Sequence, residues 1–197
     1  MSKELTFYFD FSSAYSYIAQ KTVEEAFANT GVTVKWQPIL LGIIFRENGW
    51  SPVTPDTPKG KYTFCDVARY ARAEKLVFKL PKVFPYNSML AARVFYTLPE
   101  ATAVLFAKAI FHAVFAEGQD AASQEVIGKL LQKLNVDAAN ILEKSGSDEI
   151  KAAVRSATAI ALEKGVFGAP TFAIGDELFW GADRLEHAKR WCETGGW

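Results

Sequence analysis

The feature that most constrains this chain is an apolar run near its start that ends in serines where a helical pattern begins. The aromatic-rich segment from Leu5 to Phe11 predicts a β-strand. From Ala14 onward, apolar side chains recur every three or four positions, which predicts a helix that stops at Gly31. Ser13 is therefore expected at a helix N-terminus, where free backbone amides and the helix dipole favour an anion.

Strand signals recur only at the two ends of the chain. Residues 32–38 form a second predicted strand, so the chain opens with a strand–helix–strand unit whose crossover should be right-handed. Residues 40–162 carry almost no strand signal, and a loop rich in Pro, Gly and Asn is predicted over 43–60. Further helices are predicted over residues 62–75, 88–98, 101–116, 123–134, 147–165 and 183–193, and hairpin strands over 170–174 and 177–180.

This order of elements predicts an α/β protein with a thioredoxin-like fold and a large inserted all-helical domain. We expect the thioredoxin-like domain to be discontinuous, comprising residues 1–39 and 163–197, with the helical domain spanning 40–162. A chain of 197 residues, 50% of them hydrophobic, is long enough to bury a substantial core.

The charge balance limits the classes of partner. Lys plus Arg and Asp plus Glu both total 22, so no overall field attracts nucleic acid or an acidic membrane surface, and small molecules or proteins are the expected partners. The longest apolar segment, 101–116, is too short to span a membrane and contains Lys108 and His112. Residues 1–4 lead directly into a strand without a secretory leader, so we expect a soluble cytoplasmic protein.

The two cysteines point to neither redox nor metal chemistry. Cys65 and Cys192 lie far apart, without C-x-x-C or metal-ligand spacing, so we expect reduced structural thiols and no metal site. The C-x-x-C spacing is instead held by Ser13 and Ser16, and serine cannot cycle between thiol and disulfide. Dithiol catalysis at this position is therefore excluded.

Two roles for Ser13 remain open. An ordinary N-cap explains the residue without any function. Alternatively, its hydroxyl and the helix N-terminus could stabilise a thiolate supplied by a ligand. A serine hydrolase is a competing functional hypothesis, but no G-x-S-x-G motif surrounds Ser13. Of the two histidines, His112 is expected to be structural on a largely buried helix and His187 to face solvent.

A second candidate region lies near the other end of the chain. Pro170 stands at the mouth of a predicted strand, where a cis Ala169-Pro170 bond is expected to turn the Ala169 backbone toward an extended peptide-like thiol such as glutathione. Asp183 and Arg184 begin the last helix. The carboxylate of Asp183 could hold a ligand amine, and Arg184 with the helix end could hold a ligand carboxylate. Alternatively, Asp183 only caps the helix and Arg184 is an ordinary surface residue.

Five segments in order resemble 2-hydroxychromene-2-carboxylate isomerases, which are grouped with kappa-class glutathione transferases and related to bacterial disulfide oxidoreductases. The resemblance covers essentially the whole chain. The segments are residues 9–17 (FDFSSAYSY), 59–62 with Asp66 and Arg69, 84–88 (FPYNS), 166–172 (VFGAPTF) and 180–185 (WGADRL).

The resemblance implies a glutathione-dependent cis–trans isomerase in the breakdown of aromatic hydrocarbons, acting as a homodimer. In that family the thiolate of glutathione adds to the chromene substrate, a bond rotates, elimination gives trans-o-hydroxybenzylidenepyruvate, and glutathione returns unchanged. The resemblance implies that Ser13 stabilises the thiolate and that four further residues bind glutathione: Ala169, Pro170, Asp183 and Arg184.

The substrate-binding residues implied by the resemblance are Lys59, Asn87, Trp50 and Tyr15, with Lys59 paired to a carboxylate. Two positions depart from the family pattern: Ala14 replaces a usual proline, and Trp50 replaces a frequent asparagine, which makes it a stacking wall for an aromatic substrate. The loop that holds Trp50 and Lys59 could instead be a solvated connector. Kappa-class conjugation of glutathione to electrophiles, and a non-catalytic binding module, are the alternative functions.

Overall fold

The computed structural model describes residues 4–197, so the predictions that fall on residues 1–3 lie outside the described residues. Its sheet has the strand order β2-β1-β3-β4. Strands β1 (Glu4–Phe9) and β2 (Thr33–Pro38) are parallel, whereas β3 (Thr171–Ile174) and β4 (Glu177–Trp180) are added antiparallel. Segments from the two ends of the chain thus share one sheet, which confirms the thioredoxin-like fold.

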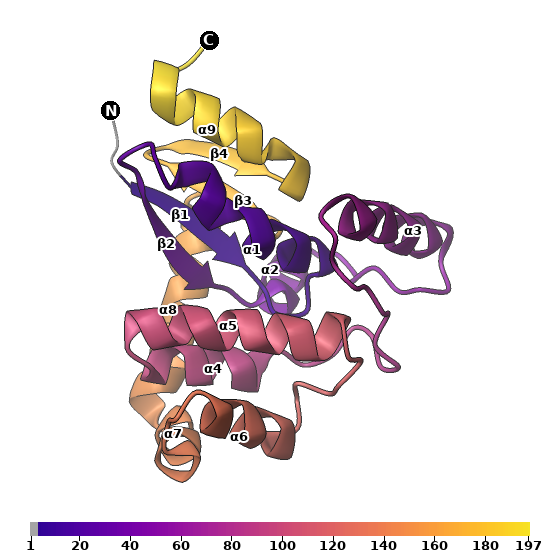
Figure 1. Cartoon of the computed structure of the whole chain (residues 1–197), viewed down its shortest axis with the longest axis vertical. Helices are drawn as coiled ribbons and strands as arrows, with labels where there is room; N and C mark the ends of the chain where they lie inside the picture. Colours follow the sequence, from indigo (N-terminus) through magenta and orange to yellow (C-terminus); the bar gives the residue numbers. More distant parts are fainter. Residues whose placement is uncertain (1–3) are drawn as a thin grey trace.

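Helices cover both faces of this sheet (Figure 1). Helices α1 (Ala14–Phe27) and α9 (Leu185–Thr194) pack on one face, and α2 (Leu41–Glu47) and α8 (Asp148–Glu163) pack on the other. A short 3-10 helix, η1 (Ala182–Arg184), precedes α9. The alternation of side chains along β1 explains the two layers, since Phe7 and Phe9 face one core and Tyr8 faces the other.

The segment between β2 and β3 consists of helices joined by loops and, among the described residues, contains no strand, as predicted. In addition to α2 and α8 it contains α3 (Pro58–Ala73), α4 (Met89–Thr97), α5 (Glu100–Phe115), α6 (Gln124–Lys133) and α7 (Ala138–Ser145). Figure 1 shows α4 to α7 gathered below the sheet and α3 projecting to one side. The domain limits at 39/40 and 162/163 stay a prediction, and α8 packs against both α4 and the sheet.

The predicted loop over 43–60 is wrong at both ends. Its first residues belong to α2, which has no side-chain cap at Leu40 and therefore no capping signal in the sequence. Its last residues belong to α3, which begins at Pro58 after the N-cap Thr57. Proline is favoured in the first helical turn, so that start could have been predicted. The short helix α7 was also not predicted, although Asp137 caps it.

Candidate functional site

Ser13 caps α1, as predicted. Its backbone is extended (φ −86°, ψ 114°), and its Oγ accepts a hydrogen bond from the amide of Ser16 at 3.1 Å. The Ser13 amide donates to the carbonyl oxygen of Asp10 at 2.9 Å, which closes the turn between β1 and α1. Ser13 is therefore confirmed as the N-cap of α1, and a role in ligand binding would be a second role of the same residue.

The same hydroxyl reaches across to the second candidate region. Ser13 Oγ donates to the carbonyl oxygen of Ala169 at 2.8 Å, a contact between residues 156 positions apart. The Ala169-Pro170 bond is cis, as predicted, and the carbonyl of Pro170 accepts from the Gly181 amide at 2.9 Å. Ser13 and Ala169 are thus in contact beside the cis-proline, and their binding of a ligand stays a prediction.

Two backbone amides at the start of α1 are available to an anion. The Ser12 amide is bound to the Asp10 carboxylate, and the Ser16 amide to Ser13. Among the described residues, the amides of Ala14 and Tyr15 have no hydrogen-bond partner. Because the N-terminus of a helix carries partial positive charge, these two N–H groups form a donor pair for a negatively charged atom beside Ser13.

The second serine of the C-x-x-C spacing does not share this exposure. Ser16 is fully buried, and its hydroxyl has no hydrogen-bond partner within residues 4–197. Ser13 retains 9% exposure and borders the open side of the turn. Ser13 is therefore the serine that can meet a ligand.

Asp10 organises the turn that carries Ser13, a role that was not predicted from the sequence. Its carboxylate accepts from the Ser12 amide at 2.7 Å, from Ser12 Oγ at 2.8 Å and from the Leu41 amide at 2.7 Å. Complete burial raises the pKa of Asp10, although these bonds and one from Ser88 act in the opposite direction. An acidic residue at the end of a buried aromatic strand was the available signal.

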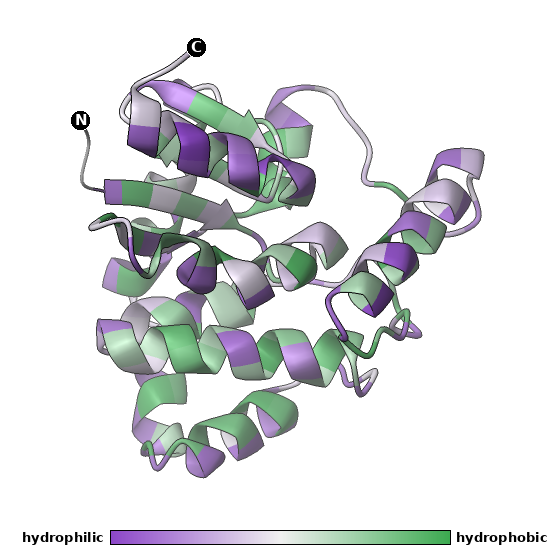
Figure 2. Cartoon of the chain, turned by 45° about the horizontal axis from the view of Figure 1, so that its top comes forward, coloured by the Kyte–Doolittle hydropathy of each residue, from purple (hydrophilic) through white to green (hydrophobic). Residues whose placement is uncertain are grey.

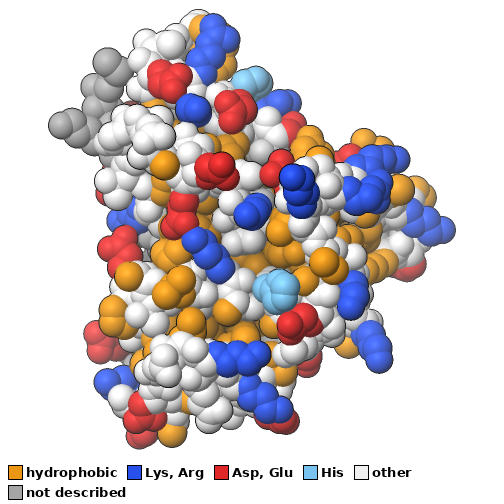
Figure 3. Space-filling view, in the orientation of Figure 1, with side chains coloured by type: hydrophobic (Ala, Val, Ile, Leu, Met, Phe, Trp, Pro, Cys, Tyr) orange, Lys and Arg blue, Asp and Glu red, His pale blue; other side chains and the backbone are white. Residues whose placement is uncertain are grey.

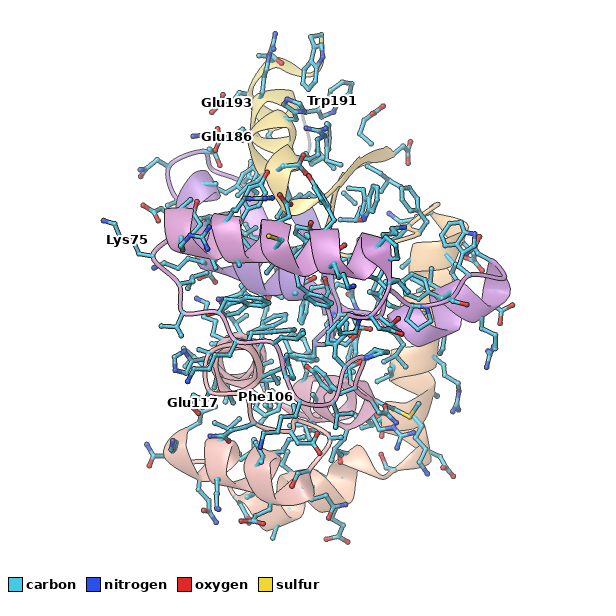
Figure 4. The ribbon with its side chains drawn as sticks, turned by 90° about the vertical axis from the view of Figure 1, so that its right-hand side faces the viewer. Lys75, Phe106, Glu117, Glu186, Trp191 and Glu193 are labelled. Carbon is cyan, nitrogen blue, oxygen red and sulfur yellow. The ribbon has the colours of Figure 1, made fainter. Side chains whose placement is uncertain are left out.

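Tyr15 connects the start of α1 to α3. Its hydroxyl donates to the carboxylate of Asp66 at 2.9 Å, and Arg69 lies 3.7 Å from the same carboxylate. Burial, and next the hydrogen bond to Asp66, raise the pKa of Tyr15, so its phenol stays protonated. In Figure 4, α3 crosses the view between α9, marked by Glu186, and α5, marked by Phe106.

Asp183 and Arg184 lie in η1, which packs against α1. The two side chains are half-exposed and form an ion pair at 3.2 Å. The pKa of Tyr70 on α3 is raised by burial and then by the charges of Asp183 and Asp66. The charges of Asp66 on α3 and Asp183 in η1 thus both act on this tyrosine, and each carboxylate also pairs with an arginine of its own helix.

The remaining predicted residues lie around this centre. Lys59 is exposed in the first turn of α3, and Asn87 is exposed and accepts from the Met89 amide at 2.9 Å, which starts α4. Trp50 packs edge-on against Phe167, with ring centroids 6.4 Å apart. The structure gives Lys59 and Asn87 no direct contact with Ser13 among the described residues, so their role in a site stays a prediction.

The histidines take no part in a hydrolase arrangement with Ser13. His187 faces solvent, as predicted, and packs on Trp197. His112 is exposed and lies 3.5 Å from Glu117, and the largely buried helix expected around it is confirmed. The helix α5 is buried largely on one side, and His112 falls on the other. The Ser13 hydroxyl is committed to Ala169, so no base activates it here.

The other predicted absences concern metals and the membrane. Cys65 is exposed and Cys192 is buried, and both are free. Residues 4–197 contain no group of three potential metal ligands. No helix in that range combines the length and the hydropathy that crossing a membrane requires. On the face shown in Figure 3, acidic and basic side chains are interspersed rather than separated into patches.

Comparison with known proteins identifies the family. Residues 4–190 match the DSBA-like thioredoxin domain family. A 2-hydroxychromene-2-carboxylate isomerase from Pseudomonas putida is 30% identical, over 91% of this chain and 89% of its own length, and one from Sphingobium xenophagum is 29% identical, over 94% and 96%. Glutathione S-transferase kappa 2 from Caenorhabditis elegans is 26% identical over 93% of this chain and 88% of its own.

Solved structures agree with this assignment. The structure of a 2-hydroxychromene-2-carboxylate isomerase superimposes with a TM-score of 0.85 and 27% identity, covering 98% of this chain and 97% of that one. The cytosolic disulfide reductase DsbM from Pseudomonas aeruginosa, solved with GSH, shares the fold at a TM-score of 0.69 and 17% identity, with 98% of each chain covered. The chain therefore belongs to the DsbA-like thioredoxin-domain family and, within it, to the 2-hydroxychromene-2-carboxylate isomerases.

Proposed function

We propose that this protein is an enzyme that isomerises 2-hydroxychromene-2-carboxylate to trans-o-hydroxybenzylidenepyruvate with glutathione as its cofactor. The observation that carries the proposal is the Ser13 site: a hydroxyl and two unpaired amides at a helix N-terminus, facing the Ala169 backbone, where a redox relative would hold a cysteine. The relatives with this name, which align over nine-tenths of the chain, support the choice of substrate.

The residues present fit glutathione. The Ala169 amide has no partner among the described residues, and the Ala169 carbonyl accepts only a hydroxyl, so both could pair with the backbone of an extended peptide. The amides of Ala14 and Tyr15 would face the sulfur. At the other side of α1, Asp183 and Arg184 offer a carboxylate and a guanidinium to the amino-acid end of the γ-glutamyl group.

When bound, glutathione would supply a nucleophilic thiolate that adds reversibly to a conjugated substrate and permits rotation about a former double bond. To stabilise a thiolate, the Ser13 hydroxyl must donate to a different acceptor, because in this structure it donates to the Ala169 carbonyl. A ligand N–H that binds the Ala169 carbonyl would replace the hydroxyl there. Ser13 would be released to donate to the sulfur while it still accepts from the Ser16 amide.

The substrate would lie over the start of α1. Tyr15, held by Asp66, would form one wall, and Lys59 would pair with the substrate carboxylate from the first turn of α3. Asn87 lies next to Tyr86, whose hydroxyl donates to the Phe11 carbonyl of the Ser13 turn. Lys59 and Asn87 would therefore border the site from the α3 arm and from the start of α4.

The test compares the two serines of the C-x-x-C spacing. For Ser13→Ala, we expect turnover to fall by about 10- to 100-fold, since a hydrogen bond to a charged group contributes about 1.5–3 kcal/mol. Ser16→Ala is the matched control, because it removes a buried hydroxyl that has no partner, and its turnover should stay close to wild type. Turnover is followed by the ultraviolet spectrum of 2-hydroxychromene-2-carboxylate, with and without glutathione.

Kappa-class conjugation is the second candidate, favoured by the kappa relatives from Caenorhabditis elegans. The same assay with 1-chloro-2,4-dinitrobenzene separates the two: conjugation without isomerisation would replace the isomerase proposal. A binding module would instead show no uptake of glutathione by calorimetry and unchanged properties in Ser13→Ala apart from the stability of α1.

The proposal includes a homodimer that acts in the cytoplasm on an intermediate of aromatic hydrocarbon breakdown. Sedimentation of the purified protein tests the dimer directly: a single species of 21.8 kDa across the working concentration range would contradict it. The domain division into residues 1–39 with 163–197 and 40–162 belongs to the same proposal, since it places the thiol site on the first unit and part of the substrate wall on the second.

A further inference from the structure

The carboxylate of Asp10 connects the starts of three helices. It accepts hydrogen bonds, both at 2.7 Å, from the amide of Ser12 next to Ser13 and from the amide of Leu41, the first residue of α2. It also interacts with the hydroxyl of Ser88, the N-cap of α4. Asp10 is only 1% exposed and forms no ion pair within residues 4–197, so these neutral donors are what stabilises its charge.

Two of these helices lack an ordinary side-chain cap. An N-cap side chain normally accepts a hydrogen bond from an amide of the first turn, but Leu40 has no acceptor and Ser88 makes no such bond. In α2, the first amide binds Asp10 instead. In α4, the serine hydroxyl is directed to Asp10 rather than to its own helix. The start of α4 is therefore joined to the residue that ends β1.

Tyr86 makes a second connection from the segment before α4. Its hydroxyl donates to the carbonyl oxygen of Phe11, in the turn between β1 and Ser13. Burial, and next the charge of Asp10, raise the pKa of Tyr86, so the phenol stays protonated and keeps this bond. Residues 86 and 88 are thus bound to residues 11 and 10.

Asn87 lies between these two connections. It is exposed, and its amide oxygen accepts from the backbone amide of Met89 at 2.9 Å. Its NH2 group has no hydrogen-bond partner within residues 4–197 and is available to a ligand. Because the residues on both sides of Asn87 are bound to the turn that ends at Ser13, the position of Asn87 relative to that turn is fixed.

We propose that Asp10 and Tyr86 are positioning residues that hold Asn87 in a fixed place relative to the Ser13 turn. The inference rests on the proposed function, in which Ser13 stabilises the thiolate and Asn87 borders the substrate. Addition of a thiolate to a bound acceptor depends on alignment, and a displacement of about 1 Å can reduce a rate by about 100-fold. Asp10 and Tyr86 would act on this alignment without touching either reactant.

The experiment removes one tyrosine hydroxyl at either end of α4. Tyr86→Phe should lower kcat for 2-hydroxychromene-2-carboxylate by about three- to tenfold and leave the affinity for glutathione, measured by calorimetry, within about twofold. Tyr96→Phe is the matched control, because Tyr96 donates to the Pro38 carbonyl at 3.0 Å from the opposite end of the helix. Its kcat should stay within about twofold of wild type.

A double-variant cycle tests whether Tyr86 acts through Asn87. Asn87→Ala should lower kcat by itself. Adding Tyr86→Phe should then change kcat by less than about twofold, because no side chain is left to position. Asp10→Asn should lower kcat by about tenfold or more, since it loosens both the Ser13 turn and the start of α4. Urea titration verifies that each variant is folded under the assay conditions.

Three kinds of result would overturn the inference. Wild-type kcat in Tyr86→Phe, Asp10→Asn or Asn87→Ala would show that the connection is not needed. An equal loss in Tyr96→Phe would assign the effect to general loosening of α4, and full additivity of Tyr86→Phe with Asn87→Ala would separate the two residues. Failure of the wild-type protein to bind glutathione would instead contradict the proposed function itself, and is seen before any variant is made.

Discussion

Helices α3 and α5 are both 16 residues long, but most of α3 lies outside the core and half of α5 is buried in it. Only Gly60, Val67 and Ala71 are buried in α3. The buried residues of α5 are Ala103, Phe106, Ala107, Ile110, Phe111, Ala113, Val114 and Phe115. Figure 2 shows the difference as a largely hydrophobic α5 and an α3 of mixed colour at the edge of the molecule. The two helices contact the residues on either side of Ser13, α5 through Phe11 and α3 through Tyr15, with very different amounts of buried apolar surface.

This difference shows how the site combines a fixed wall with an adjustable one. The aromatic rings of α5 pack against the strand that leads into the Ser13 turn. The ring centroid of Phe111 lies 5.7 Å from that of Phe9 and 5.5 Å from that of Phe11. The α3 helix is held to α1 by the hydrogen bond from Tyr15 to Asp66 and by its few apolar contacts. Elements with little buried apolar surface open at a lower free energy, so we expect α3 rather than α5 to move when a ligand enters the proposed site.

The prediction with the strongest effect concerns the wall that α5 supports. Phe111→Ala removes a fully buried ring from the contacts between α5, β1 and Tyr17, and should lower the free energy of unfolding by about 3–5 kcal/mol. Tyr62→Ala, on the exposed side of α3, should change it by less than about 0.5 kcal/mol. Urea unfolding followed by circular dichroism measures both. Similar losses for the two variants would contradict the contrast between the helices.

A smaller effect tests the turn itself. The carboxylate of Asp10 accepts hydrogen bonds from the amides of Ser12 and Leu41 with its two oxygens. Asp10→Asn replaces one oxygen with an NH2 group that cannot accept, and should lower the free energy of unfolding by about 1–3 kcal/mol. Because burial raises the folded-state pKa of Asp10, the folded protein binds its proton more tightly than the unfolded chain. The advantage of wild type over Asp10→Asn should therefore grow as the pH falls from 7 through that pKa.

The measurement is a set of urea titrations of both proteins between pH 7 and pH 4. A difference that shrinks on acidification would mean that the hydrogen bonds to the carboxylate outweigh its burial. The interpretation of Asp10 as a desolvated acid would then be wrong, while its role in holding the turn would stand.

The smallest effect tests the adjustable wall. Tyr15→Phe removes the hydroxyl that donates to Asp66 and should cost about 1 kcal/mol, less than a buried bond to a charged group because this contact is only partly buried. Hydrogen exchange should then be faster in α3 and unchanged in α5. Tyr86→Phe, which loses the bond to the Phe11 carbonyl on the fixed side, is the control that should leave exchange in α3 unaltered. Equal exchange rates in α3 of wild type and Tyr15→Phe would show that this contact does not hold the helix.

Sequence reasoning succeeded where the signal was local. The Ser13 cap, the helix of α1, the hairpin of β3 and β4 and the cap of α8 at Ser147 all follow from residues within a few positions of one another. Short helices were missed whether or not they are capped: α2 has no side-chain cap, and α7 is capped by Asp137 but spans only eight residues. The burial of Asp10 was also missed, because its donors come from Leu41 and Ser88, which are distant in the chain.

Neighbouring residues were enough to predict the order of elements, the absence of a redox dithiol at residues 13 and 16, and a helix N-terminus suited to an anion. These features depend on backbone preferences and on side-chain chemistry, which are local. The contact of the Ser13 hydroxyl with the Ala169 carbonyl, the burial of Ser16 without a partner and the packing of Phe167 against Trp50 and Trp180 became visible only in the folded chain. Contacts between distant segments depend on how the layers pack, and no local pattern encodes that packing.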